Sequence, residues 1–169
     1  LAREALKLNA DLSGILPEKV AEYVVKNRLY ALEKSDENYK YYSFVTANCT
    51  KKRLKHIAGV IWQAREYAKT LNQNVEKASL AALLHACAKY LNPEDYKAAG
   101  FNCDGVPQPV IHQFLGAFVA EKTLGVTDGE VLSAIKWHTT GKPNMSELEK
   151  IIWTADLLEP SRDFCGVDE

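Results

Sequence analysis

The four histidines of this 169-residue chain are the side chains whose type and placement are best suited to chemistry. His56, His85, His112 and His138 each lie in or at the end of a segment with helical periodicity and apolar neighbours. Asp156 follows in a fifth such segment. Imidazole and carboxylate together form the ligand set of Zn, Fe, Mn and Ni, and the carboxylate favours Fe or Mn over an all-sulfur site. We therefore expect a divalent metal site built from these five residues.

The intervals between these residues show how such a site would have to form. They range from 18 to 29 residues, which is too wide for one face of a single helix. The side chains can meet only if four or five helices converge, as in metal sites at the core of helix bundles. The alternative is that each histidine is an ordinary, partly buried residue, as single histidines usually are. The placement of all four in comparable positions favours the shared site.

Helix start and stop signals dominate the rest of the chain, and alternating patterns typical of strands are scarce. An all-α bundle is therefore expected. Thr127 with Glu130, and Ser146 with Glu149, are expected to form capping boxes, and Asn74 is a plausible N-cap. The predicted helices span residues 17–27, 50–71, 75–90, a short stretch after Asn92 that Gly100 ends, 109–124, 127–138 and 146–159.

Composition limits the kind of protein. Lys and Arg total 21 against 22 Asp and Glu, which argues against a nucleic-acid binder. No apolar run approaches the roughly 18 residues of a membrane span, and the first residues do not resemble a signal peptide. The four cysteines form no CxxC pair, which indicates free thiols and a cytoplasmic location. The chain does not begin with Met, so we expect a piece of a longer protein; a homodimer is compatible with the sequence.

Short strings around the histidines resemble a known family. The string Arg53-Leu-Lys-His56 and the string Ala82-Leu-Leu-His85 resemble the first two motifs of the HD-domain phosphohydrolases. Three further strings resemble the narrower YqeK family of symmetrical diadenosine tetraphosphate hydrolases, which yield two ADP. They are Pro109-Val-Ile-His112, Ala134-Ile-Lys-Trp-His138-Thr-Thr-Gly141 and Ala155-Asp156-Leu-Leu-Glu159-Pro-Ser-Arg162. The resemblance implies an HD-domain helical bundle over residues 50–169.

The resemblance also implies roles for individual residues. His56, His85 and Asp156 would hold one metal ion and His112 with His138 a second, so that the ions activate water for attack on phosphorus. Lys89 lies four residues after His85 in the predicted helix, on the same face, and would act on the phosphates as a catalytic residue. Backbone N–H groups after His138 are expected to be free for phosphate. The implied substrate-binding residues are Arg53, Thr139, Thr140, Gly141 and Arg162.

Position 86 departs from the family pattern. The family has an aspartate directly after the second histidine, where it is expected to bridge two metal ions, and this chain has Ala86. Alanine supplies no ligand, so the second metal site is in doubt and activity is expected to be impaired. An engineered change, natural loss and a sequence error all explain Ala86. Because the other ligand positions persist, an engineered change or recent loss is favoured over an old inactive enzyme.

Residues 1–30 carry a second resemblance, and residues 31–49 read as a linker or a short irregular helix. The string Leu16-Pro-Glu-Lys-Val-Ala-Glu-Tyr23 is similar to the last segment of bacterial nicotinate-nucleotide adenylyltransferases. This suggests a fusion in which an adenylyltransferase precedes the HD domain. We expect a helical extension that packs on the HD bundle or on that adenylyltransferase, because its apolar side chains need burial. An ordinary amphipathic helix on the bundle is the alternative.

Three functions remain open from the sequence alone. The first is a metal-dependent hydrolase of dinucleoside polyphosphates, impaired by Ala86. The second is a non-catalytic nucleotide-binding or regulatory module of a fusion protein with an adenylyltransferase. The third is an HD phosphohydrolase acting on other nucleotides. All three predict a nucleotide as the partner of the site.

Overall fold

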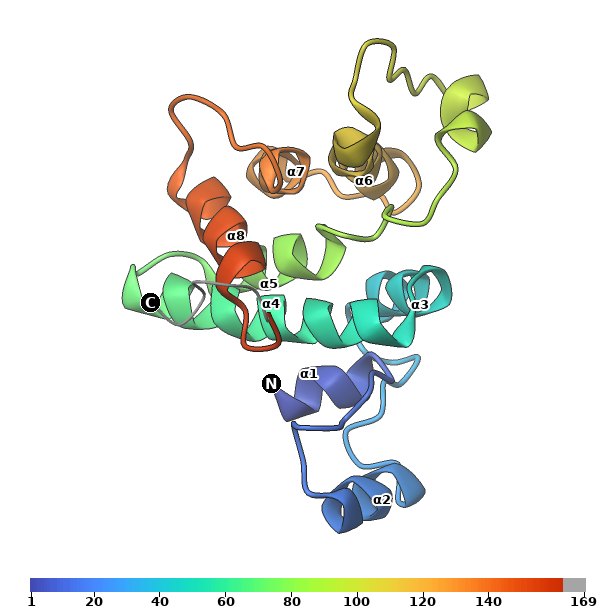
Figure 1. The fold of residues 1–169 in the computed structure, drawn as a ribbon, viewed down its shortest axis with the longest axis vertical. Helices are drawn as coiled ribbons and strands as arrows, with labels where there is room; N and C mark the ends of the chain where they lie inside the picture. Colours follow the sequence, from blue (N-terminus) through green and yellow to red (C-terminus); the bar gives the residue numbers. More distant parts are fainter. Residues whose placement is uncertain (163–169) are drawn as a thin grey trace.

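All regular elements among residues 1–162, the part of the chain that the computed structural model describes, are helices (Figure 1). This confirms the expected all-α architecture. The α-helices are α1 (Ala2–Lys7), α2 (Glu18–Lys26), α3 (Tyr39–Asn48), α4 (Lys51–Thr70), α5 (Val75–Leu84), α6 (Ile111–Lys122), α7 (Gly129–Trp137) and α8 (Glu147–Leu158). Two 3-10 helices, η1 (Pro93–Ala99) and η2 (Gln108–Val110), lie between α5 and α6.

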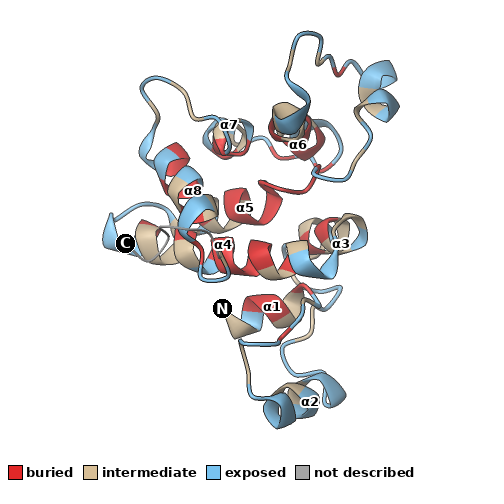
Figure 2. Ribbon diagram, viewed as in Figure 1, coloured by how far each residue is buried: buried red, intermediate tan, exposed pale blue. Residues whose placement is uncertain are grey.

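The core lies between α4 and the later helices (Figure 2). Helix α4 packs against α5, α8 and α1, whereas α7 joins α6 to α5 and α8. Large aliphatic side chains that are almost completely buried fill the space between them: Leu54, Ile57, Ile61, Leu84, Leu115, Ile135, Ile151 and Ile152. In the described residues no helix is both long enough and apolar enough to cross a membrane. Because α4, α5, α7 and α8 share one core, side chains on all four can meet inside it.

Side-chain caps begin the long helices largely as the sequence indicates. The Thr50 hydroxyl accepts from the Arg53 N–H at the start of α4, and Asn74 caps α5 in the same way. The Ser146–Glu149 capping box is present at α8. The box expected at Thr127 is wrong: Asp128 caps α7 by accepting two backbone N–H groups. Asp128 lies one residue nearer the helix, and its carboxylate takes those donors.

Two helices differ in extent from the prediction. Helix α5 ends at Leu84, six residues before the expected end at Tyr90. The reason is His85, whose Nδ1 lies 2.6 Å from the Ala82 carbonyl oxygen and occupies the acceptor that the next helical N–H would use. Residues 39–48, expected as a linker or short irregular helix, form the regular helix α3, which packs on α5.

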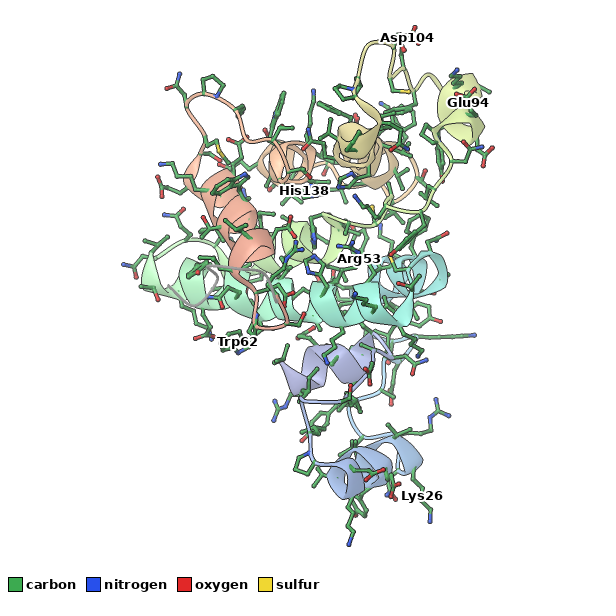
Figure 3. All side chains as sticks on the ribbon, in the orientation of Figure 1. Lys26, Arg53, Trp62, Glu94, Asp104 and His138 are labelled. Atoms are coloured by element: carbon green, nitrogen blue, oxygen red, sulfur yellow. The ribbon has the colours of Figure 1, made fainter. Side chains whose placement is uncertain are left out.

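The N-terminal segment contains one helix that packs closely on the bundle and one that is largely exposed. Helix α1 lies against α4 and buries Ala5, whereas α2 stands apart at the end of the molecule (Figure 1) and buries no residue. Tyr23 is 63% exposed and Val25 58%, and Lys26 points into solvent (Figure 3). Ala21 of α2 packs against the core and Val24 is half-buried, so α2 contacts the bundle along one edge only, and the expected packing on the bundle or on an adenylyltransferase stays a prediction.

Three of the four cysteines lie in the described part of the chain, and all three are free thiols there. Burial raises the pKa of Cys87 to about 12, so this residue packs as a small apolar side chain. Cys165 lies outside the described residues.

Candidate metal centre

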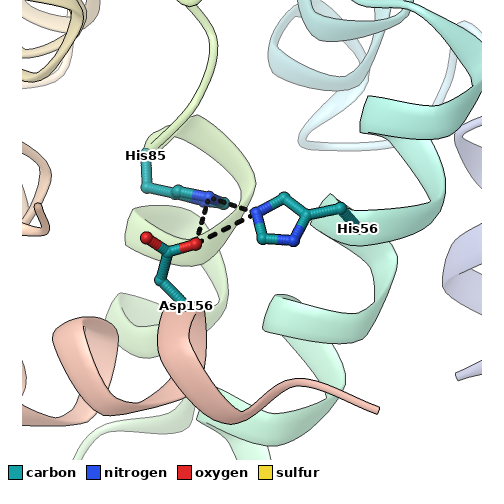
Figure 4. Close-up of side chains that lie close together, drawn as sticks. All are labelled: His56, His85 and Asp156. Carbon is teal, nitrogen blue, oxygen red and sulfur yellow. Dashed lines mark hydrogen bonds and ion pairs between the residues drawn. The ribbon is translucent and has the colours of Figure 1, made fainter. Parts of the chain in front are cut away.

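Three of the five predicted ligands meet between α4, α5 and α8. His56 projects from the second turn of α4, His85 caps the end of α5, and Asp156 lies in the last turn of α8 (Figure 4). Nε2 of His56 is 3.2 Å from Nε2 of His85 and 3.0 Å from Oδ1 of Asp156. Nε2 of His85 is 3.7 Å from the same oxygen. Both histidines are buried, so the three donor atoms share one enclosed position.

The other two histidines meet next to this triad. Nε2 of His112, in α6, lies 3.2 Å from Nε2 of His138, which caps α7. The rings of His85 and His138 are 5.1 Å apart at their centroids, so the four imidazoles form one continuous row. Within residues 1–162, the triad is the only group of three His, Cys, Asp or Glu side chains whose donor atoms lie close enough to share one ion. The pair of His112 and His138 has no such third donor there.

Hydrogen bonds at Nδ1 fix which nitrogen of each ring is available. Nδ1 of His85, His112 and His138 lies 2.6 to 3.0 Å from the carbonyl oxygen three residues earlier in the chain. A carbonyl only accepts, so we assign the proton to Nδ1 in all three. Nε2 is then the lone-pair nitrogen and points into the row. His56 differs, because its Nδ1 donates to the carboxylate of Glu159 at 3.0 Å.

The electrostatic environment keeps the imidazoles of His85, His112 and His138 uncharged. Burial lowers the pKa of His85 well below its ordinary value and also lowers that of His138. Burial, together with His138 and Lys89, lowers the pKa of His112 to about 4. Burial alone would raise the pKa of Asp156, but the His56 hydrogen bond and the surrounding imidazoles outweigh it and hold that pKa below its usual range. At neutral pH the site offers lone pairs and a carboxylate.

These donors fit a divalent transition metal. Two ligands of one ion, each about 2.1 Å from it, are separated by about 3.0 to 3.4 Å in octahedral or tetrahedral geometry. The separations of His56 from His85 and from Asp156 fall in or at the edge of that range, and the 3.7 Å between His85 and Asp156 is a few tenths of an ångström longer. Lone pairs that face each other at such distances repel unless a cation lies between them. The triad therefore has the spacing and the chemistry of a metal site.

Lys89 reaches the row, although not from a helix face. Because α5 ends at Leu84, the expected placement of Lys89 four residues along a continuous helix is wrong. It lies in the following turns, and its Nζ is 3.5 Å from Nδ1 of His112. Burial lowers the pKa of this lysine. The pair of His112 and His138 thus has a lysine ammonium beside it, where the triad has a carboxylate.

A basic cleft opens from the triad along the start of α4. It has a volume of about 1280 Å³, and His56 and Glu159 form part of its lining. Arg162 was expected to bind substrate; it lines the cleft, but two of its N–H groups already hold Asp156, at Oδ1 and at the backbone oxygen. Tyr90 and the segment Ala10–Leu12 form other walls. The cationic residues of the lining are Lys51, Lys52, Arg53, Lys55 and Arg162.

The segment Thr139–Gly141 is held differently from our expectation. Its backbone N–H groups are not free for phosphate, because those of Thr139 and Thr140 donate to Oε1 of Gln113 and that of Gly141 donates to a carbonyl of α7. The Thr139 hydroxyl lies 3.3 Å from Nε2 of His112, so this side chain does reach the row. Gly141 has a φ of +63°, which favours glycine at this turn.

Two buried polar residues of the site were missed by the sequence analysis. Gln113 is completely buried and anchors the segment after His138, and Glu159 is 2% exposed and holds His56. The available signal was a polar residue in an apolar helix next to a predicted ligand, for Gln113, and the specific Asp-x-x-Glu string, for Glu159.

Comparisons with known proteins agree with this geometry. The HD-domain family model matches residues 53–161. A "Bis(5'-nucleosyl)-tetraphosphatase, symmetrical" of Halalkalibacterium halodurans is 36% identical over 136 residues, which cover 77% of this chain and 73% of that protein. A crystal structure of a "predicted HD superfamily hydrolase involved in NAD metabolism" from Clostridium acetobutylicum superposes with a TM-score of 0.68 at 40% identity, over 76% of this chain and 72% of that one.

A longer match links the chain to a protein named for two activities. A "Probable nicotinate-nucleotide adenylyltransferase/Ap4A hydrolase" of Mycoplasma genitalium is 27% identical over 159 residues, which cover 92% of this chain and 43% of that protein. Taken with the family model and the two nearer relatives, the chain belongs to the HD-domain family of hydrolases. Within that family it is related to the symmetrical bis(5'-nucleosyl)-tetraphosphatases.

Proposed function

We propose that the chain is a metal-dependent phosphohydrolase of dinucleoside polyphosphates, and that its site cleaves diadenosine tetraphosphate into two ADP. One observation carries the proposal: His56, which shares the triad with His85 and Asp156 and begins the row of four imidazoles, lines a cleft that also carries five cationic side chains. The relatives named symmetrical tetraphosphatases support the substrate class.

The cleft suits an extended polyphosphate. Its 1280 Å³ exceeds the roughly 300 to 1,000 Å³ of a pocket for one drug-sized ligand, so it has room for more than one nucleotide. Lys51, Lys52, Arg53 and Lys55 line it along the start of α4. Positive charge at a helix N-terminus opposes the helix dipole, and a bound anion relieves that cost. Arg53 lies one turn before His56, so it would bring phosphate to the metal position.

The residues of the row and those beside it would have different roles. His56, His85 and Asp156 would hold an Fe or Mn ion, because two imidazoles and a carboxylate suit these metals. A divalent ion there supplies Lewis-acid polarisation of a phosphoryl oxygen and activates water for attack on phosphorus. Lys89 and the Thr139 hydroxyl, both beside His112, would bind phosphate oxygens. The guanidinium of Arg162 would keep Asp156 oriented and offer its remaining N–H groups to the cleft.

Ala86 is proposed to impair this site. Without the bridging carboxylate of the family, His112 and His138 keep only neutral donors and face Lys89, which disfavours a second cation. Substrate would still bind through the cleft. We expect hydrolysis at least about 100-fold slower than in Ala86→Asp, with nucleotide affinity within about tenfold, because lost electrostatic stabilisation acts mainly on the chemical step.

A paired assay tests the proposal. Parent chain and Ala86→Asp are loaded with Mn²⁺ or Fe²⁺ and given diadenosine tetraphosphate, and ADP is quantified by chromatography. Faster ADP formation by Ala86→Asp supports the hydrolase. If both proteins bind metal and nucleotide but neither forms ADP, the chain is a non-catalytic nucleotide-binding module, which is the second candidate that Ala86 favours. Equal turnover by both would show that position 86 is dispensable.

A partner is proposed for the N-terminal segment. A match that covers 92% of the chain leaves about 14 residues outside it, so the Mycoplasma match necessarily includes α2. We therefore propose that the exposed apolar side chains of α2, Tyr23 and Val25 among them, pack on a nicotinate-nucleotide adenylyltransferase domain. The test measures binding of such a domain, taken from the Mycoplasma protein, to the parent chain and to the double variant Tyr23→Ser/Val25→Ser. Equal binding, or none by either, would contradict the proposal.

A further inference from the structure

His56 differs from the other three histidines in that no backbone carbonyl of its own segment accepts its Nδ1–H. His85 and His138 stand at helix ends and His112 follows a 3-10 turn, so each finds a backbone carbonyl for its Nδ1–H. His56 lies inside the 20-residue helix α4. Carbonyls in the interior of a helix already accept the N–H four residues later. The partner of this ring therefore has to come from another element.

Glu159 supplies that partner and is itself held in place. It follows α8 directly and is 2% exposed. Its Oε1 accepts from Nδ1 of His56 at 3.0 Å and from the Ser161 hydroxyl at 2.6 Å, while Oε2 accepts from the Ser161 N–H at 2.7 Å. Because its two oxygens accept these three hydrogen bonds, the carboxylate has little freedom to turn away. The proton of His56 is thereby placed on Nδ1.

Gly59 makes room for the carboxylate. It lies three residues after His56 on the same face of α4, and a Cβ built there would overlap Oε2 of Glu159 and crowd its Cδ and Cβ. The backbone of Gly59 has no unusual φ, so the glycine is required for space and not for conformation. A glycine inside a helix costs about 1 kcal/mol relative to alanine. That cost is understandable if the carboxylate must sit against the helix.

We propose that Glu159 is a positioning residue that directs the Nε2 lone pair of His56 to the metal position shared with His85 and Asp156. Gly59 leaves the space that the Glu159 carboxylate occupies. The inference rests on the proposed metal site. A carboxylate that accepts from a metal-binding imidazole fixes the ring and raises its basicity, and losing such a partner typically costs 10- to 100-fold in metal affinity. Glu159 also adds a negative charge on the triad side of the row.

Mn²⁺ titration of the parent, Glu159→Ala and Glu159→Gln measures the effect. Glu159→Ala should weaken Mn²⁺ binding about 10- to 100-fold. Glu159→Gln keeps the volume and one acceptor oxygen, so it should lose less than Glu159→Ala but still at least about threefold. Gly59→Ala should act in the same direction by displacing the carboxylate. Unchanged affinity in Glu159→Ala would overturn the proposal, and an equal loss in the alanine and glutamine variants would contradict the positioning role.

Glu149 provides a matched control. It is also 2% exposed and lies at the other end of α8, but it bonds Lys142, Ser133 and the N-cap of its own helix. Glu149→Ala should lower the thermal midpoint and leave Mn²⁺ affinity within about twofold, because only the fold depends on it. A comparable loss of affinity in Glu149→Ala would show that destabilisation of α8, and not positioning of His56, explains the effect.

A second readout does not depend on metal. In metal-free protein, NMR should detect a slowly exchanging Nδ1 proton of His56, absent in Glu159→Ala and retained in Glu149→Ala. If the parent binds no Mn²⁺ but shows this proton, the proposed metal site fails while the positioning contact stands. If the proton persists in Glu159→Ala, the inference fails even where the parent binds Mn²⁺.

Discussion

His56 and His85 face a carboxylate, whereas in the described residues the charged group beside His112 and His138 is a lysine. Both halves of the row place two Nε2 atoms 3.2 Å apart and hold Nδ1 by a hydrogen bond. The halves therefore match in geometry and differ in charge. On one side lie the carboxylates of Asp156 and Glu159, with Arg162 bound to Asp156, and on the other lies Lys89.

This difference predicts what position 86 controls. Imidazoles alone place donor atoms, but neutral donors do not offset the charge of a divalent cation in a buried site. Asp156 provides that compensation for the triad. Ala86, which is 2% exposed and follows His85 directly, provides none for the pair. The row is a site with two sets of donors, only one of which has charge to match a metal ion.

The largest difference between the two halves is expected in Mn²⁺ affinity when one donor is removed from each. Asp156→Asn should weaken Mn²⁺ binding by more than about 100-fold, above the 10- to 100-fold effect of an indirect partner, because the variant loses the charged donor of the triad. His112→Asn should change the affinity of the parent by less than about threefold. Isothermal titration of both variants measures this. Similar losses in the two would contradict the assignment of metal to the triad.

Acid should destabilise the metal-free protein through both halves. Unfolded histidines take up protons near pH 6.5, whereas burial lowers the pKa of His85 and His138 and lowers that of His112 to about 4. Between pH 6.5 and 4 the unfolded state therefore binds more protons, and stability falls as the pH falls. We expect the thermal midpoint in EDTA to drop by about 4 °C or more from pH 7 to pH 5.

The measurement is a series of thermal scans across that pH range. His112→Asn removes one of the titrating groups and should show a smaller drop than the parent. A midpoint that stays level, or rises as the pH falls, would show that these imidazoles are not held neutral in the fold.

The smallest effects are expected at α2, outside the bundle. Tyr23 is exposed in the described structure, so Tyr23→Ser should change the free energy of unfolding by no more than about 0.5 kcal/mol. Leu115 is completely buried among the helices of the row, and Leu115→Ala should cost about 2 to 5 kcal/mol. Chemical denaturation compares the two. A large cost for Tyr23→Ser would mean that α2 is part of the same cooperative unit as the bundle.

Local signals allowed much of the fold to be predicted. The start of α5 at Asn74 and the capping box at Ser146 depend on side chains within three residues of the bonds they make. The end of α5 was not predictable in this way, because it depends on the side chain of His85 taking a carbonyl from its own helix. Helix α3 was missed as a regular helix because its buried side chains, Tyr42 and Val45, matter only once α3 packs against its neighbours.

The same distinction between local and long-range contacts applies to the candidate site. Residue type and the family strings indicated His56, His85 and Asp156, and the structure brings these three together. The contact of His56 with Glu159 joins residues 103 positions apart, and no spacing rule reveals it. The N–H groups after His138 were expected to be free, but Gln113 accepts from two of them. Gln113 lies in a different helix, so this contact could not be predicted from the local sequence.

Counting Mn²⁺ ions per chain tests the central claim most directly. Equilibrium binding on the parent and on Ala86→Asp, followed by anomalous diffraction to locate the ions, gives both number and position. We predict one tightly held ion in the parent, between His56, His85 and Asp156, and two in Ala86→Asp. Two fully occupied positions in the parent, or a single ion between His112 and His138, would contradict the account.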